Sequence, residues 1–141
     1  MSEVQGKPLD KKNIRHIAIA VKNLERSKEM FALIGTADVS ETVEVPDQKV
    51  ICCFIETQGS RIELIQPTEG NVGVANFLEK RGEGVHHICL GVNDIEATLD
   101  DLRDRGFRLI DEKPRIGAEG HRIAFIHPHS TGGVLIELEE Q

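Results

Sequence analysis

The sequence contains no tryptophan, no tyrosine and no apolar run long enough to cross a bilayer. A transmembrane helix needs about 20 apolar residues in a row, so we expect no membrane span. No basic segment followed by an apolar one opens the chain, which argues against a secretory signal. The three cysteines are odd in number and lack C-x-x-C spacing, which fits a reducing compartment. We therefore expect a cytoplasmic protein.

Clusters of basic residues are also missing, and the net charge is −7. Nucleic acids are bound mainly by grouped lysines and arginines, and the lack of Trp and Tyr leaves few rings to stack on bases. We therefore expect no nucleic-acid partner. The chain has 141 residues, of which 39% are hydrophobic, enough for one compact domain or for two half-size modules that share a core.

The most informative feature is an internal duplication. The repeated motif reads His16-Ile-Ala-Ile-Ala-Val-Lys-Asn-Leu-Glu25 in the first copy and His87-Ile-Cys-Leu-Gly-Val-Asn-Asp-Ile-Glu96 in the second. Each copy also closes with the same tripeptide, Ile62-Glu63-Leu64 and Ile136-Glu137-Leu138. One structural unit is therefore used twice, with a histidine and a glutamate at matched positions.

Each half predicts a strand, a helix and three further strands. The limits of these elements follow from hydrophobic periodicity and from glycines that end the helices. Asn23 and Asp94 are the expected helix caps. The expected elements are strand 14–21, helix 24–34 and extended runs 37–45, 48–57 and 60–66, then strand 86–92, a helix from 95 that ends before Gly106, and extended runs 107–112, 120–127 and 133–139. We expect one domain, 13–141, made of modules 13–67 and 85–141 joined by a helical connector at 70–82, after a disordered polar leader at 1–12.

The repeated polar residues all point away from the bulky apolar faces of their strands. Side chains alternate along a strand, so His16 and His87 each share a face with small residues, while Glu63 and Glu137 lie opposite isoleucine and leucine. Burying four such groups without partners would cost about 1–3 kcal/mol each. Two imidazoles and two carboxylates suit a divalent ion such as Co²⁺, Mn²⁺, Ni²⁺ or Zn²⁺.

An alternative interpretation makes the two histidines core residues bonded to backbone and the two glutamates solvent-facing strand residues. The matched recurrence of all four in both copies favours the metal. We therefore predict a metal site formed by His16, Glu63, His87 and Glu137.

With these residues, the chain resembles the vicinal oxygen chelate superfamily over residues 14–139. The resemblance implies an α+β fold in which two tandem β-α-β-β-β modules form a cupped mixed sheet around a metal, and it places the four predicted ligands on the family's metal positions. Longer motifs resemble the methylmalonyl-CoA epimerases: Phe77-Leu-Glu-Lys-Arg-Gly-Glu-Gly-Val-His-His-Ile-Cys-Leu90, Lys113-Pro-Arg-Ile-Gly-Ala-Glu-Gly120 and His127-Pro-His-Ser-Thr-Gly-Gly-Val-Leu-Ile-Glu-Leu138.

This resemblance implies an isomerase that removes and returns the proton at C2, interconverting (R)- and (S)-methylmalonyl-CoA, with Co²⁺ favoured and a homodimer expected. Glu137 is the candidate base. Cys52 stands where some epimerases carry a catalytic glutamate, and it is either a second proton carrier or a residue that lines the cavity. Glu63 stands where some members have glutamine, so the ligand set equally resembles glyoxalase I.

The phosphates of coenzyme A need cationic partners. Candidates near the closing strands are Lys113, Arg115, Arg122 and His129, each with an ordinary surface cation as the alternative. His86, on the opposite strand face from His87, is expected to be structural, and His127 to position substrate or support the fold.

Three other functions compete with the epimerase. A lactoylglutathione lyase of the glyoxalase I type would use the same metal on a glutathione hemithioacetal. A ring-cleaving dioxygenase would need iron held by two His and one Glu, which a fourth protein ligand disfavours. A non-catalytic small-molecule binding protein of the same fold would need no metal.

Overall fold

The computed structural model describes residues 12–34 and 38–141. Except for Lys12, the leader expected at 1–12 lies outside the described residues. The chain divides into two compact units, which we call the first unit, Arg15–His87, and the second unit, residues 12–14 with Ile88–Gln141. No helix in the described parts of the chain is long and apolar enough to span a membrane.

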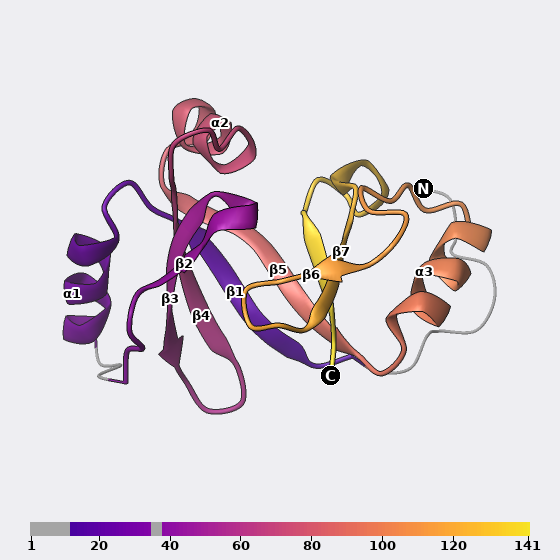
Figure 1. Ribbon diagram of the computed structural model, residues 1–141, viewed down its shortest axis with the longest axis horizontal. Coiled ribbons are helices and arrows are strands. Elements are labelled where there is room, and N and C mark those ends of the chain that lie inside the picture. The colour runs from indigo at the N-terminus through magenta and orange to yellow at the C-terminus, as the bar shows by residue number, and fades with distance from the viewer. Residues whose placement is uncertain (1–11, 35–37) are drawn as a thin grey trace. The chain divides into compact units, whose positions relative to one another are not determined.

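The first unit has the order β-α-β-β-β, followed by a helix (Figure 1). Its elements are β1 (Ile14–Ala20), α1 (Leu24–Ile34), β2 (Val43–Val45), the 3₁₀ turn η1 (Pro46–Gln48), β3 (Val50–Glu56), β4 (Arg61–Pro67) and α2 (Gly73–Arg81). The strand order is β2-β3-β4-β1, with β1 and β4 parallel and the other pairs antiparallel. Parallel strands need a long crossover connection, which here includes α1.

The second unit repeats this plan (Figure 1). Its elements are the end of β5 (Gly84–Val92), α3 (Ile95–Asp104), β6 (Arg115–Ile116), β7 (Arg122–Ile126), the 3₁₀ turn η2 (Pro128–Ser130) and β8 (Ile136–Glu140). The strand order is β5-β8-β7-β6, again with the first and last strands of the module parallel. The predicted α+β fold of two tandem β-α-β-β-β modules is therefore confirmed.

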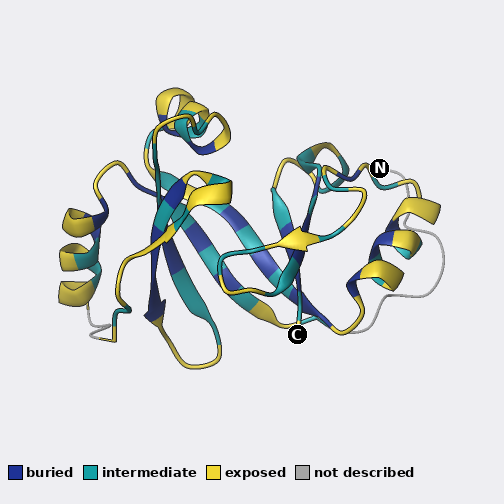
Figure 2. Ribbon diagram, viewed as in Figure 1, coloured by how far each residue is buried: buried dark blue, intermediate teal, exposed yellow. Residues whose placement is uncertain are grey.

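Each unit has its own apolar core between its helix and one face of its strands (Figure 2). In the first unit the buried core is Val21, Leu24, Cys53, Ile55 and Leu64. In the second unit it is Val92, Ile95, Leu99, Leu102, Leu109, Ala124, Ile126 and Leu138. Because these side chains occupy one face of each set of strands, the alternate residues face the other way.

Both helix caps agree with the sequence. The Asn23 Oδ1 accepts a hydrogen bond from the N–H of Arg26 at 3.1 Å, and the Asp94 Oδ1 accepts one from the N–H of Ala97 at 3.0 Å. Each side chain satisfies an N–H in the first turn that has no partner inside the helix.

The expected strand at 107–112 does not form. This segment makes one isolated bridge, between Leu109 and Ile126, and the edge strand β6 forms later, at Arg115–Ile116. The Asp111 carboxylate accepts a hydrogen bond from the N–H of Phe125 at 2.8 Å. A side chain therefore takes the β7 donor that a paired strand's carbonyl would use, which prevents a regular ladder here.

Candidate metal centre

The register of the first unit places His16 and Glu63 on the same face of its strands. Strands β1 and β4 are parallel, with Ala18 opposite Glu63 and His16 opposite Arg61. Directly paired residues point to the same face, and residues two apart on a strand do so as well. The intervening residues, such as Leu64, belong to the core under α1. His16 and Glu63 therefore point away from α1.

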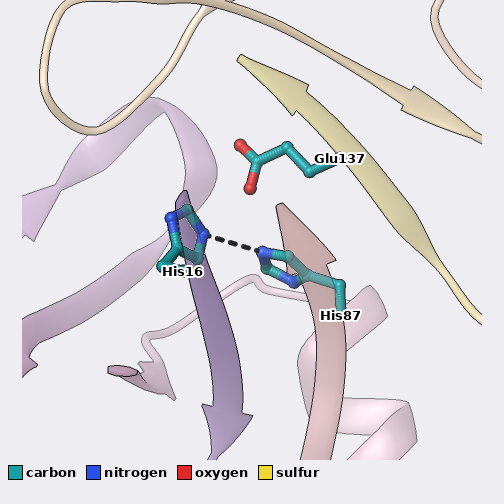
Figure 3. A group of neighbouring side chains, drawn as sticks. All are labelled: His16, His87 and Glu137. Atoms are coloured by element: carbon teal, nitrogen blue, oxygen red, sulfur yellow. Dashed lines mark hydrogen bonds between the residues drawn. The ribbon is translucent and has the colours of Figure 1, made fainter. Parts of the chain in front are cut away.

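Three buried polar side chains meet on this face. The Nε2 atoms of His16 and His87 lie 3.4 Å apart, and the two imidazoles are turned toward each other (Figure 3). The Glu63 Oε1 lies 3.3 Å from the His16 Nε2 and 4.0 Å from the His87 Nε2. These residues are only 3% (His16), 6% (Glu63) and 5% (His87) exposed.

This cluster has the chemistry and spacing of a metal centre. Nitrogen and oxygen ligands bind Zn²⁺ at about 2.0–2.2 Å in a tetrahedral arrangement, so two ligands of one ion lie roughly 3.3–3.6 Å apart. The distances of 3.3 and 3.4 Å from the His16 Nε2 fall in that range. Imidazole and carboxylate donors suit Co²⁺, Mn²⁺, Ni²⁺ and Zn²⁺ alike. The residues present therefore fit a divalent ion.

The fourth predicted ligand, Glu137, belongs to the second unit. It is 6% exposed on β8, where its register partner on β5 is Cys89. Its neighbour Leu138 belongs to the apolar core, so the Glu137 side chain lies on the face away from α3.

His86 contacts His87 on the side of its ring away from the Nε2 atom, and this contact was not expected from the sequence. Its Nδ1 lies 2.9 Å from the Nδ1 of His87, and its ring meets the edge of Phe77 at a centroid distance of 5.0 Å. The Nε2 of His87 faces His16, and it can bind a metal only when the His87 Nδ1 donates in this contact and the His86 Nδ1 accepts; in that form the contact orients the His87 ring. The available signal was the adjacency of the two histidines in the sequence.

Cys52 lies on β3 opposite Ile65 of β4, so it shares the face of Glu63, and it is 1% exposed. Its neighbour Cys53 lies on the other face, in the core. Burial there raises the pKa of the Cys53 thiol. All three cysteines of the chain are thiols rather than disulfides.

The four candidate phosphate-binding residues differ in their surroundings. Lys113, Arg115 and His129 are exposed. The Arg115 Nε donates to Asp111 at 3.1 Å. Arg122 binds both carboxylate oxygens of Glu140, at 3.0 and 2.9 Å, and also contacts Glu96 at 3.3 Å.

Two further histidines lie at the turn η2: His127 caps its start and His129 lies within it. The Nδ1 of His127 accepts a hydrogen bond from the N–H of His129 at 3.0 Å. Desolvation, and then the charge of Arg108, lower the pKa of His127. A neutral imidazole is the form that can accept this hydrogen bond, so His127 supports the turn.

Arg61 and Phe54 are two further residues of this face that the sequence did not single out. Phe54 is the register partner of Glu63, and Arg61 is that of His16. The Arg61 Cζ lies 4.1 Å from the centre of the Phe54 ring. The spacing of Arg61 and Glu63, two apart on one strand, was the signal that could have revealed the arginine.

The sequence is similar to those of several enzymes with known names. A methylmalonyl-CoA epimerase of Dictyostelium discoideum, named as mitochondrial, is 40% identical over 129 residues, which are 91% of this chain and 78% of that protein. The human mitochondrial methylmalonyl-CoA epimerase is 36% identical over 99% of this chain and 80% of its own length. A probable lactoylglutathione lyase of Vibrio cholerae is 30% identical over 89% of this chain and 88% of its own length.

The fold is also similar to that of solved methylmalonyl-CoA epimerases. A methylmalonyl-CoA epimerase in complex with methylmalonyl-CoA and NH4+ superposes with a TM-score of 0.85 at 35% identity, covering 92% of this chain and 94% of that one. A family profile matches residues 15–125, a range that includes His16, Glu63 and His87. The chain belongs to the glyoxalase/bleomycin resistance protein/dioxygenase superfamily.

Proposed function

We propose that this protein is a methylmalonyl-CoA epimerase, which interconverts the (R) and (S) forms by removing and returning the proton at C2. The observation that carries the proposal is the buried group of His16, Glu63 and His87, in a chain 40% identical to a curated enzyme of that name. An acyl-CoA thioester with a free carboxylate is the substrate.

The metal ligands are His16, Glu63, His87 and Glu137. The first three are supported by their mutual distances, and Glu137 by its burial and by its pairing with Cys89, two residues beyond His87 on β5. A divalent ion bound by these residues would supply positive charge to offset the negative charge that develops on the thioester oxygen as the C2 proton leaves.

Glu137 is the proposed base. A carboxylate held in a buried position near C2 can accept the proton with little motion, and its burial excludes competing water. Its 6% exposure supports this role. The buried imidazoles of His16 and His87 keep the site compact and orient Glu63 through the short contact to His16.

Returning the proton to the other side of C2 needs a second carrier, and Cys52 is the candidate. Its register on β3 puts it on the same face as Glu63, and a thiolate near a cation forms more readily than a free one. The alternative is that Cys52 only lines the cavity. Replacing it with alanine separates the two roles.

For the coenzyme A tail, we propose Lys113, Arg115 and His129 as the first contacts of the phosphates, because all three are exposed. Arg122 remains a candidate, but to bind a phosphate it would have to share its guanidinium with Glu140 or release that carboxylate. Charge reversal at each position and measurement of KM for methylmalonyl-CoA would rank the four.

We further propose Co²⁺ as the native ion, a homodimer as the assembly and the cytoplasm as the location. The donor set supports Co²⁺ as one of four suitable metals, and three cysteine thiols support a reducing compartment. Metal analysis of the purified protein, light scattering and localisation of the tagged protein test these points.

The experiment that tests the function is proton-deuterium exchange at C2 of methylmalonyl-CoA in deuterated buffer. We expect exchange with the metal-loaded protein, loss of exchange with a chelator, and recovery when Co²⁺ is added back. An absence of metal-dependent exchange would contradict the proposal. Turnover of the methylglyoxal–glutathione hemithioacetal instead would favour the second candidate, a lactoylglutathione lyase, to which the chain is also similar.

A further inference from the structure

Gln48 carries a buried hydrogen-bond donor that the fold does not use. Its Nε2 is screened from solvent and has no hydrogen-bond partner among residues 12–34 and 38–141, the parts of the chain that the structure describes. Nearly all buried polar groups in proteins are paired, because a buried N–H without an acceptor destabilises the folded state. A donor in this condition indicates an acceptor that a bound molecule supplies.

The turn that carries Gln48 is fixed by other bonds. The Asn71 Nδ2 donates to the carbonyl oxygens of Gln48 and Lys49, each at 3.1 Å, and the N–H of Thr68 donates to that of Lys49 at 2.9 Å. The Asn71 Oδ1 accepts from the N–H of Val74 at 2.9 Å, which ties the turn to the start of α2. The backbone of the turn, and not a bond made by the side chain, therefore sets the place of the Gln48 amide.

This turn, η1, leads directly into β3, the strand that carries Cys52. Val50 and Cys52 pair with alternate residues of β4, so both lie on the face of Glu63. Val50 is only 6% exposed, so this face stays covered as far as the turn. Because four residues of chain span at most about 14 Å, the backbone of Gln48 lies no farther than that from Cys52.

The surroundings of Gln48 suit a neutral acceptor. The pantetheine arm of coenzyme A, which joins the thioester sulfur to the phosphates, contains two amide groups with uncharged carbonyl oxygens. Asp47 precedes Gln48 and Lys49 follows it, both exposed, so their charges offset each other. Glu44, on β2 of the same hairpin, is exposed as well. These charges favour an amide over a phosphate at the turn.

We propose that the Gln48 Nε2 donates a hydrogen bond to an amide carbonyl of the pantetheine arm and so directs the thioester toward the proposed metal centre. This inference rests on the proposed function. With the acyl group near Glu63 and Cys52, the arm leaves the centre along β3 and passes the turn at its start. Gln48 is then a substrate-binding residue that acts on the arm and not on the reacting carbon.

The test compares methylmalonyl thioesters that keep or lack the amides. The coenzyme A thioester has both, the N-acetylcysteamine thioester has only the one nearer the sulfur, and the butyl thioester has neither. Gln48→Met keeps the length of the side chain and removes the donor. We expect kcat/KM for exchange at C2 to fall about 10-fold with methylmalonyl-CoA and to stay unchanged with the butyl thioester.

The loss should appear in KM more than in kcat, because the contact exists before the reaction. The N-acetylcysteamine thioester assigns the amide. A loss with this substrate identifies the nearer amide, and an unchanged value identifies the farther one.

Thermal stability separates this role from a structural one. Gln48→Met removes an unpaired donor from a buried place, so the melting temperature of the ligand-free protein should stay the same or rise. Gln58→Met, in the exposed loop between β3 and β4, is the matched control and should change neither stability nor kcat/KM. Should Gln48→Met fail to fold, Gln48→Glu replaces it, since an ionised carboxylate keeps the length but cannot donate.

Equal loss with methylmalonyl-CoA and the butyl thioester would overturn the proposal, because it would indicate a damaged centre or fold. An unchanged kcat/KM with methylmalonyl-CoA would overturn it as well, since a buried water would then be the acceptor. The proposed function fails separately, when the wild type shows no metal-dependent exchange at C2. Calorimetric binding of propionyl-CoA needs no turnover, so binding about 10-fold weaker in Gln48→Met than in the wild type still tests the contact in that case.

Discussion

The Nε2 atoms of His16 and His87 lie 3.4 Å apart although 71 positions separate the two residues in the sequence. Each histidine opens the same repeated motif, and Glu63 approaches the first at 3.3 Å. The duplication has thus placed the same residue of each copy in contact with the other, edge to ring, in the buried cluster.

Removing one imidazole should abolish tight metal binding. Changes to residues that only support ligands already cost about 10- to 100-fold in affinity, so His87→Ala should cost more than about 100-fold for Co²⁺. Calorimetric titration of the metal-free protein measures this. Glu63→Gln keeps an oxygen donor but loses its charge, so it should bind Co²⁺ more weakly than the wild type and more tightly than His87→Ala. Equal affinity in all three proteins would contradict the metal site.

His86 should act on the metal through His87. His86→Phe removes the 2.9 Å contact between the two Nδ1 atoms and keeps a ring against Phe77. We expect Co²⁺ affinity to fall by about 10- to 100-fold while thermal stability changes little. His121→Phe, in the loop between β6 and β7, is the control and should leave Co²⁺ affinity unchanged. Unchanged affinity in His86→Phe would mean that the contact only fills space.

The two proposed proton carriers should differ in importance. Glu137→Gln removes the base and should lower the rate of exchange at C2 by about 10²- to 10⁴-fold. Cys52→Ala should keep most of the rate if the thiol only lines the cavity, and should lower the exchange of one epimer more than that of the other if it carries a proton. Exchange followed from each pure epimer distinguishes the outcomes. A fully active Glu137→Gln protein would exclude Glu137 as the base.

The Arg122–Glu140 pair should stabilise the fold in a pH-dependent way. Hydrogen bonds from Arg122, and then from the N–H of Ile95, lower the pKa of Glu140. A lowered carboxyl pKa means that the stabilisation is present above the ordinary pKa of glutamate, about 4.3, and is lost as the pH falls through the lowered value.

Arg122→Met should therefore lower the melting temperature by a few degrees at pH 7. The difference from the wild type should shrink as the pH falls below about 4, and it should be much smaller in a Glu140→Gln background, where Arg122 keeps only its 3.3 Å contact to Glu96. Thermal denaturation across pH measures both effects. A difference that stays constant down to pH 2 would assign the loss to packing rather than to the ion pair.

Much of this fold could be predicted because the sequence contains two copies of the same structural unit. The repeated motif fixes β1 and β5, and alternation correctly assigns His16 and Glu63 to the face opposite the core. The caps at Asn23 and Asp94 also follow, since short polar side chains before an apolar helix have few other roles.

Other features depend on register between strands, which one sequence does not reveal. Arg61 lies over Phe54 only because β3 and β4 pair with Phe54 opposite Glu63. The segment before Asp111 alternates like a strand, but the Asp111 carboxylate takes a β7 donor. Alternation also separates His86 from His87, yet their Nδ1 atoms lie 2.9 Å apart because adjacent rings can rotate toward each other.

The most direct test of the metal centre is an anomalous difference map, collected at the cobalt edge, from a crystal grown with Co²⁺. We predict one peak per chain, within about 2.2 Å of the Nε2 atoms of both His16 and His87 and of a Glu63 oxygen. No peak at these atoms, in a protein that still exchanges the C2 proton of methylmalonyl-CoA, would contradict the account.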